Sequence, residues 1–311
     1  MGDSPSDGNR PSALEASDIA SLAVLTLVWG STWAAIRVSL AGIPPLAGMA
    51  IRFLAAGGIL LAVARWRGVA LGRTAIERRL WAWNALTTFL VPYGTIYWAE
   101  QWVPTGLASI LFSTFPLWVV ALGRWLLPAE RLDLRRMMGV VLGFVGVGVV
   151  FSEDFTRLGG AGVRWPATAL LGAAAVSASG TLALRRWGRS ISPLSLASVP
   201  MLATGVAAGI LAALWERQRG LTSAPWPWVA TAYLAIFGSA VTFTLYFRLL
   251  SRRGAVLASM VSYTAPVVAV GVGIVAFDEP ITGRVVGGAA LVLAGVALVL
   301  RPSRSARAPG G

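Results

Sequence analysis

Long apolar stretches alternate with short polar segments along almost the whole chain. Each apolar stretch has roughly the 20 residues that a helix needs to cross the hydrocarbon core of a bilayer. The ten stretches cover residues 18–40, 44–66, 79–102, 104–127, 134–151, 165–187, 192–214, 226–250, 254–277 and 281–300. This pattern predicts an all-α integral membrane protein with ten transmembrane helices.

The two ends of the chain depart from this pattern. Residues 1–17 and 301–311 are polar and are expected to form cytoplasmic tails. The first 17 residues have no basic segment followed by a short apolar core, which predicts that no signal peptide is removed and that the first helix is retained. The composition agrees with a membrane protein, because only 13% of the residues are charged, whereas soluble domains have about a quarter.

All 26 basic residues are Arg, and they are distributed unevenly among the polar segments. If the N-terminus is cytoplasmic, 17 of them fall in cytoplasmic segments and five in outer loops. The positive-inside rule then places both termini in the cytoplasm. In a soluble protein the net charge of +13 would indicate nucleic-acid binding, but here topology accounts for it. Arg in place of Lys, with abundant Ala and Gly, points to a bacterial genome rich in G and C. The expected location is therefore the bacterial inner membrane.

The second half of the chain repeats motifs of the first half. Two motifs recur 150 residues later, Leu107-Ala108-Ser109 as Leu257-Ala258-Ser259 and Pro116 as Pro266. After a slip of one residue, Glu130, Arg135, Gly139 and Gly146 correspond to Glu279, Arg284, Gly288 and Gly295. We therefore expect two repeats, residues 18–151 and 165–300. With five helices each, they would be inserted in opposite orientations around a central cavity, as inverted repeats of secondary transporters are.

Several short motifs also follow one another in a recognisable order. They are Trp29-Gly30-Ser31-Thr32, Pro44-Pro45, Arg52-Phe53, Gly106 to Ala108, Pro116, Glu130-Arg131-Leu132, Gly254-Ala255, Pro266 to Ala269, Glu279, Gly287-Gly288 and Gly295. In this order, over about residues 18–301, the chain resembles the drug/metabolite transporter (DMT) superfamily, in its ten-helix EamA-domain family. The resemblance implies a carrier of small organic metabolites, nearest to the bacterial exporters of aromatic and neutral amino acids.

Aromatic residues on two helices are candidates for substrate binding. Trp33 lies in the first helix, and Tyr93, Tyr97 and Glu100 share one face of the third, after Pro92, which should kink it. A polar stripe of this length is costly to expose to lipid. We therefore expect Trp33 and both Tyr residues to line the cavity, with Glu100 at its rim. An aromatic belt at the outer membrane interface is the alternative.

The two prolines that match across the repeat are candidates for hinges. Pro116 and Pro266 each free the carbonyl four residues earlier, and in a membrane such a carbonyl needs a partner or a wet cavity. With Pro92, they are predicted to be hinge or gating positions. The other candidates for substrate binding are Ser113, Trp118, Ser177, Phe243, Tyr246, Ser262 and Tyr263. The alternative for the small hydroxyls is ordinary contact between helices.

Four Arg residues lie in or near the expected helices, and two of them, Arg37 and Arg52, are candidates for a role inside the membrane. An intramembrane Arg is by default a functional candidate, and either Arg37 or Arg52 could meet a substrate carboxylate. The alternative is that each side chain reaches the surface or fixes helices through backbone carbonyls. For Arg52 the structural role is favoured.

The chain lacks the residues that most catalysis requires. It has no His, Cys or Lys, and no pair of carboxylates within an apolar stretch, so neither an enzyme nor a metal or other cofactor is expected. All 13 acidic residues fall in termini, loops or helix ends. This distribution predicts alternating access without a proton relay, as a facilitator or an exchanger.

The expected partners are a small-molecule substrate and membrane lipids, not nucleic acid. Gly139 and Gly143 have the GxxxG spacing of close helix packing, which is more readily assigned to packing inside a monomer than to a dimer, so a monomer or weak homodimer is expected. Two alternative functions stay open at this point. One is a lipid-handling or structural membrane protein, and the other is a carrier of a different metabolite, such as a nucleoside.

Overall fold

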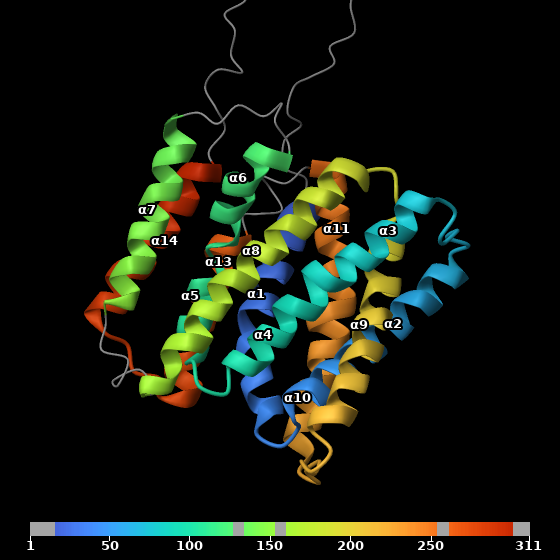
Figure 1. Cartoon of the computed structure of the whole chain (residues 1–311), viewed down its shortest axis with the longest axis horizontal. Coiled ribbons are helices and arrows are strands. Elements are labelled where there is room, and N and C mark those ends of the chain that lie inside the picture. The colour runs from blue at the N-terminus through green and yellow to red at the C-terminus, as the bar shows by residue number, and fades with distance from the viewer. Residues whose placement is uncertain (1–15, 127–133, 153–159, 254–260, 301–311) are drawn as a thin grey trace, which may run out of the picture.

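The first and last helices begin and end at the same end of the molecule. The computed structural model describes residues 16–126, 134–152, 160–253 and 261–300, and these ranges contain helices and no strand. Helix α1 (Ala16–Leu40) starts at the top in Figure 1, where α14 (Gly283–Leu300) ends. Helix α2 (Pro45–Trp66) follows α1 after a short turn and starts with a proline, which suits the first turn of a helix.

Two long rods each contain a π-helix in the middle. The first rod consists of α3 (Ala75–Asn84), η1 (Ala85–Leu90) and α4 (Val91–Ala99). The second consists of α10 (Pro225–Ala235), η4 (Ile236–Val241) and α11 (Thr242–Arg253). Short π-helices are rare and are frequently found at functional sites. The expected single helices 79–102 and 226–250 are therefore interrupted helices.

The expected helix 104–127 is also divided. Helix α5 (Thr105–Phe112) and α6 (Phe115–Leu126) are separated by a turn at Ser113 and Thr114. Pro116 lies in the first turn of α6 and has no backbone N–H to donate to the carbonyl of Phe112, so the α-helical hydrogen bonds stop there. This turn at Ser113 and Thr114 is the kink that Pro116 predicts.

Helices α7 (Leu134–Phe151) and α14 form a pair at one side of the bundle, at the left in Figure 1. Glycines allow their backbones to touch. A Cβ at Gly146 would lie 2.7 Å from the carbonyl oxygen of Gly288, and one at Gly295 would lie 2.5 Å from that of Gly139. The small residues at 139 and 143 thus pack two helices of the same chain, as expected.

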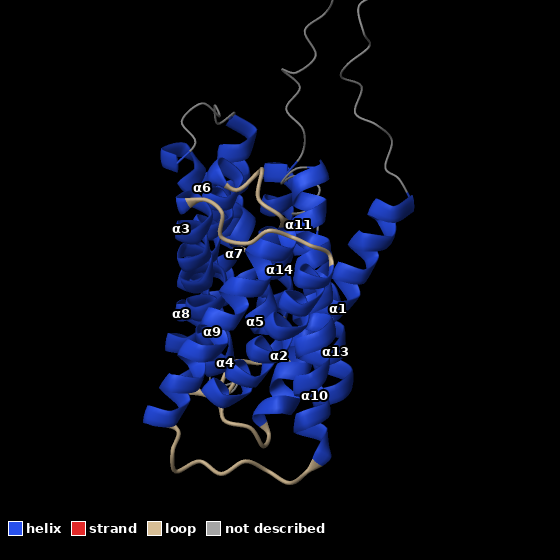
Figure 2. Ribbon diagram, turned by 90° about the vertical axis from the view of Figure 1, so that its right-hand side faces the viewer, coloured by secondary structure: helices blue, strands red, loops and turns tan. Residues whose placement is uncertain are grey.

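The remaining helices build the rest of the bundle. Helix α8 (Arg164–Trp187) follows one turn of 3-10 helix, η3 (Ala161–Val163), and packs against α4 and α6. Helix α9 (Pro193–Trp215) packs along α2. Helix α13 (Val261–Phe277) lies against α1 and α5, and α1 also contacts α10. Most helices run roughly vertically in Figure 2, and the loops gather at the two ends of the bundle.

The outer surface of the bundle suits a lipid environment. Six helical stretches are long and apolar enough to span a bilayer, and three further apolar helices are shorter. Large apolar side chains face outward on several of them, including Leu27, Val145 and Ile210. Because water would penalise such a surface, the chain is a multi-span membrane protein. Polar side chains are buried inside the bundle, among them Thr32 of α1, Arg52 of α2 and Asn84 of α3.

Candidate substrate cavity and latch

A cavity of about 140 Å³ lies beside α1, in the middle of the bundle. Helices α1, α4, α5, α6, α8, α11 and α13 contribute to it, together with η1. Its lining consists of Trp29, Thr32, Trp33, Ile36, Thr88, Tyr93, Ile96, Ser109, Phe112, Ser113, Phe115, Ser177, Thr181, Phe243, Tyr246, Val261, Ala265 and Pro266. A dry cavity of about 150 Å³ is enough to bind benzene, so this space suits one aromatic ring.

Seven of the eighteen residues that line the cavity are aromatic. The ring of Trp29 lies 5.4 Å from that of Phe243 and 5.2 Å from that of Tyr246. On the other side, the rings of Trp33 and Phe112 are 5.9 Å apart and meet edge to face. Such pairs hold one another in fixed orientations, so the wall is rigid and presents both ring faces and ring edges to a bound molecule.

Three small hydroxyls of the cavity, those of Thr32, Ser109 and Ser113, are hydrogen-bonded to backbone carbonyls of their own segments. Thr32 Oγ1 donates to the Trp29 carbonyl, and Ser113 Oγ donates to the Ile110 carbonyl, both over 2.7 Å. Ser109 Oγ makes the same kind of bond to Gly106. A hydroxyl that has donated its proton retains acceptor capacity on its oxygen. The described lining contains no Asp, Glu, Lys or Arg, so its polarity comes from these oxygens and from Tyr93 and Tyr246.

Arg52 lies directly behind the cavity wall and is completely buried. Its Nε donates to Ser239 Oγ over 2.8 Å and its Nη2 to the Gly238 carbonyl over 3.1 Å, so both bonds reach the π-helix η4. Its guanidinium also stacks on the ring of Tyr93 at 4.6 Å. These contacts match the structural role expected for Arg52, which joins α2 to η4. Nη1 has no hydrogen-bond partner among the described residues.

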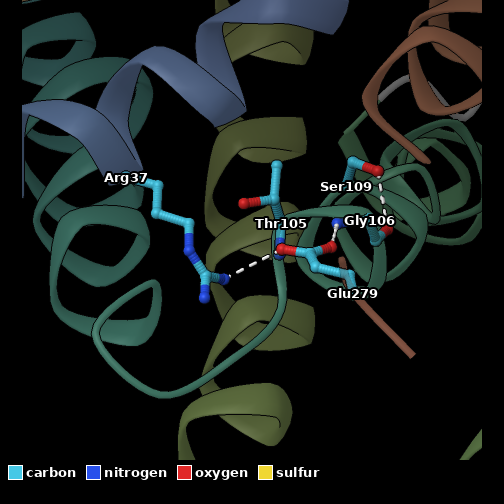
Figure 3. Close-up of polar contacts among 5 residues, drawn as sticks. All are labelled: Arg37, Thr105, Gly106, Ser109 and Glu279. Carbon is cyan, nitrogen blue, oxygen red and sulfur yellow. Dashed lines mark hydrogen bonds and ion pairs between the residues drawn. The ribbon is translucent and has the colours of Figure 1, made fainter. Parts of the chain in front are cut away.

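Glu279, just after α13, joins three parts of the chain. Its Oε1 accepts a hydrogen bond from Arg37 Nη1 over 2.9 Å and one from the Thr105 backbone N–H over 2.6 Å. Its Oε2 accepts from the Gly106 N–H over 2.9 Å. Figure 3 shows the carboxylate between Arg37 and the N-terminus of α5, where a negative charge is favoured. We call Arg37, Thr105, Gly106 and Glu279 the latch.

The backbone around Glu279 is shaped to bring the carboxylate back to α5. Asp278 has φ +48, a left-handed conformation that Asp tolerates better than most residues. The Glu279 N–H then donates to the Gly273 carbonyl over 3.2 Å. A Cβ at Gly273 would collide with the Glu279 carboxylate. Glycine at position 273 is therefore required for the closed latch.

Glu100 caps the C-terminus of α4 and is buried, with 4% of its surface exposed. The expectation that it lies at the cavity rim is therefore wrong. A short turn after Glu100 leads to α5. Neither of its carboxylate oxygens has a hydrogen-bond partner among the described residues. The prediction of transport without a proton relay assumed that no carboxylate is buried in the bundle. The burial of Glu100 removes that premise.

The structure brings seven of the predicted site residues together. These residues, which all line the cavity, are Trp33, Tyr93, Ser113, Ser177, Phe243, Tyr246 and Pro266. They come from five helices and the turn between α5 and α6, and could be grouped from the sequence only through their chemistry and helical phase.

Four other predicted residues do not line the cavity. Tyr97 is one turn beyond Tyr93, and its ring packs toward Gly48 of α2. Trp118 stacks edge to face on Phe144 of α7 at 5.0 Å. The two other residues, Pro92 and Pro116, occupy the first turns of α4 and α6. The side chains of the last two candidates, Ser262 and Tyr263, lie outside the described part of the structure.

Sequence analysis missed several lining residues. Thr88 reaches the cavity from the π-helix η1, and no sequence pattern indicates a π-helix there. Ile36, Ile96 and Phe115 are apolar residues in apolar helices, so nothing in the sequence separates them from the core. The latch was also missed, although the charges of Arg37 and Glu279 in apolar surroundings are a usable signal.

Comparison with known proteins places the chain in a family. The profile of the EamA-like transporter family matches residues 18–152 and again residues 164–301. The chain is 30% identical to the "uncharacterized inner membrane transporter YedA" of Escherichia coli, over 81% of this chain and 80% of that protein. It is 26% identical to "Protein PagO" of Salmonella typhimurium, over 79% of this chain and 81% of that protein.

More distant similarities cover almost the whole chain. The "uncharacterized transporter YvbV" of Bacillus subtilis is 25% identical over 92% of both chains. A solved crystal structure superposes with a TM-score of 0.67 at 22% identity, covering 92% of this chain and 96% of the other, which shows a shared fold. These matches agree with the multi-span helical bundle. The chain belongs to the EamA-like transporter family and is a membrane transporter.

Proposed function

We propose that the chain carries aromatic and neutral amino acids across the bacterial inner membrane, as an exporter that works by alternating access. The observation that carries this proposal is the cavity, which has room for about one aromatic ring and a wall of rings and hydroxyl oxygens. An ammonium group is attracted to the faces of aromatic rings and donates to oxygens such as those of Thr32 and Ser113. The carboxylate would be met by Tyr93, which stacks on Arg52.

The proposal includes ten transmembrane helices. The six long apolar stretches, the three shorter apolar helices and the continuous rod from α3 to α4 together provide ten crossing segments. An even number of crossings agrees with the position of the α1 start and the α14 end at one end of the bundle. The Arg distribution favours the cytoplasm for that end. The latch then lies at the outer face.

We further propose that the two halves are inverted repeats. Both halves match the same family profile, and π-helices occupy the same place in the third helix of each half. The contacts between α7 and α14 support it. The repeat alignment equates Gly139 with Gly288 and Gly146 with Gly295. Exchanging the two halves replaces Gly146 by Gly295 and Gly288 by Gly139. The contact between Gly146 and Gly288 therefore has its counterpart in the contact between Gly295 and Gly139.

Competition in proteoliposomes tests the substrate class. Vesicles loaded with unlabelled phenylalanine would take up radiolabelled phenylalanine in exchange. Tyrosine, tryptophan and leucine in the medium should reduce this uptake, and aspartate and lysine should not, since the described cavity wall offers no opposite charge for their side chains. If only nucleosides reduce the uptake, the substrate class is nucleosides and not amino acids. Equal inhibition by every compound would contradict a selective cavity.

A further inference from the structure

Two carboxylates at the latch end of the bundle have opposite surroundings. Glu279 accepts three hydrogen bonds, two from the first backbone N–H groups of α5 and one from Arg37. Glu100 is more than nine-tenths buried, and both of its oxygens lack any partner among the described residues. A buried charge without hydrogen bonds is strongly disfavoured, whereas Glu279 has the partners that an ionised carboxylate needs. When two acids are placed so differently, one is ionised and the other holds a proton.

The groups around Glu100 support this assignment. The charges that act on it are those of Glu279, Arg37 and Arg52. Arg37 is already paired with Glu279, and Glu279 repels a second negative charge. Glu100 also caps the C-terminus of α4, where the helix dipole opposes a carboxylate.

Arg52 attracts a carboxylate, but two of its nitrogens are committed to Ser239 and Gly238. Its third nitrogen, Nη1, makes no bond to Glu100. The neutral, protonated acid is therefore the form that fits.

A path for the proton leads toward the cavity. Tyr93, Tyr97 and Glu100 follow one face of the same rod at spacings of four and three residues, which places them along one side of a helix. Tyr93 lines the cavity. Tyr97 lies between Tyr93 and Glu100 in the sequence, and its hydroxyl is buried without a hydrogen-bond partner among the described residues. Tyr97 thus lies away from the cavity but between it and the buried acid.

We propose that Glu100 is a proton-binding site of this transporter, loaded while the latch is closed. When the latch opens, Arg37 separates from Glu279 and becomes available as a counter-ion for Glu100. The O–H bond of the Glu100 carboxylic acid then breaks, the proton passes to water, and the carboxylate pairs with Arg37. Proton binding is in this way linked to the closed state of the latch. This inference adds a coupling ion to the proposed transport function but can be measured without any substrate.

Infrared spectroscopy of the purified protein in lipid vesicles detects the site directly. At neutral pH the wild type should show the carbonyl absorption of a protonated carboxylic acid, and Glu100→Gln should lose it. Asp278→Asn is the matched control, because it removes a carboxylate at the same end of the bundle from an exposed position. That variant should keep the band. Absence of the band from the wild type, or its persistence in Glu100→Gln, would overturn the inference.

A second variant tests the link to the latch. Glu279→Gln removes the negative charge near Glu100 and releases Arg37, so both changes favour the ionised form of Glu100. The carboxylic acid band should therefore weaken in Glu279→Gln at neutral pH and return on acidification. A band of unchanged intensity would show that the latch does not control the proton. Because neither spectrum depends on a transported molecule, a failure here is separate from a failure of the amino-acid competition test.

Discussion

Arg37 of α1 and Glu279, next to α13, lie 242 residues apart in the sequence and form an ion pair with 2.9 Å between Nη1 and Oε1. The same carboxylate caps α5, so one side chain joins the first half of the chain to the second. A single exposed ion pair contributes little to stability. This pair differs because Glu279 is only 7% exposed and also accepts two backbone N–H groups. The arrangement closes one end of the bundle below the cavity.

The closed latch predicts opposite effects for two glycines of α13. Gly273→Ala should destabilise the protein, by about 1–3 kcal/mol in the free energy of unfolding, because the added methyl group would collide with the Glu279 carboxylate. Gly271→Ala adds the same group where no atom lies within 4 Å. It should be neutral or stabilising by about 0.5–1 kcal/mol, since Ala suits a helix better than Gly.

Thermal unfolding in detergent measures the difference between the two variants. Gly273→Ala should have a lower Tm than the wild type, and Gly271→Ala should have an equal or higher Tm. Equal losses in both would mean that the effect belongs to the helix and not to the latch.

Two phenylalanines of the second interrupted rod test the cavity. Phe243 is 5% exposed and lines the cavity, and Phe237 is 47% exposed on the outer surface. Phe243→Ala removes the ring that packs on Trp29 and should raise the KM for phenylalanine about tenfold, which corresponds to a loss of about 1.4 kcal/mol of binding. Phe237→Ala removes the same number of atoms and should leave KM unchanged. Similar KM values for both variants would remove Phe243 from the substrate site.

The proposed orientation can be tested with cysteine labelling, because the natural chain contains no Cys. Ser223 and Ala70 are both exposed and lie in loops, one before α10 and one between α2 and α3. In intact cells, a membrane-impermeant thiol reagent should label Ser223→Cys and should label Ala70→Cys only after the membrane is permeabilised. The reverse pattern would place the latch at the cytoplasmic face.

Much of the fold follows from the sequence, because hydrophobic length is a strong signal in membrane proteins. The helices α1, α2, α8 and α9 begin and end within a few residues of the predicted stretches. The interruptions of the helices were harder to predict from the sequence. Pro116 indicates the break before α6, whereas no residue pattern indicates the π-helices η1 and η4. At η1, Gly180 of α8 lies against Thr87 and Thr88, and a Cβ at position 180 would lie 2.5 Å from Thr87 Oγ1.

The site was predictable where chemistry and helical phase agree. Trp33, Tyr93 and Phe243 carry large rings at positions that face the bundle axis, and they line the cavity. Tyr97 has the same chemistry, but it lies one turn farther along α4, where its ring meets Gly48 of α2 and not the cavity. Glu100 was assigned to the rim because it ends a helix. Burial of a helix end depends on the neighbouring helices, which the local sequence does not specify.

Counterflow of phenylalanine shows whether the protein carries an aromatic amino acid across the membrane. Proteoliposomes containing the wild-type protein are loaded with a high concentration of unlabelled phenylalanine and diluted into a trace of the radiolabelled compound. The proposed carrier must accumulate label transiently above the outside concentration, because each molecule that leaves returns the site to the outside. Vesicles without protein should only equilibrate. A wild-type time course identical to that of the empty vesicles, for phenylalanine and for the other aromatic and neutral amino acids, would contradict the account.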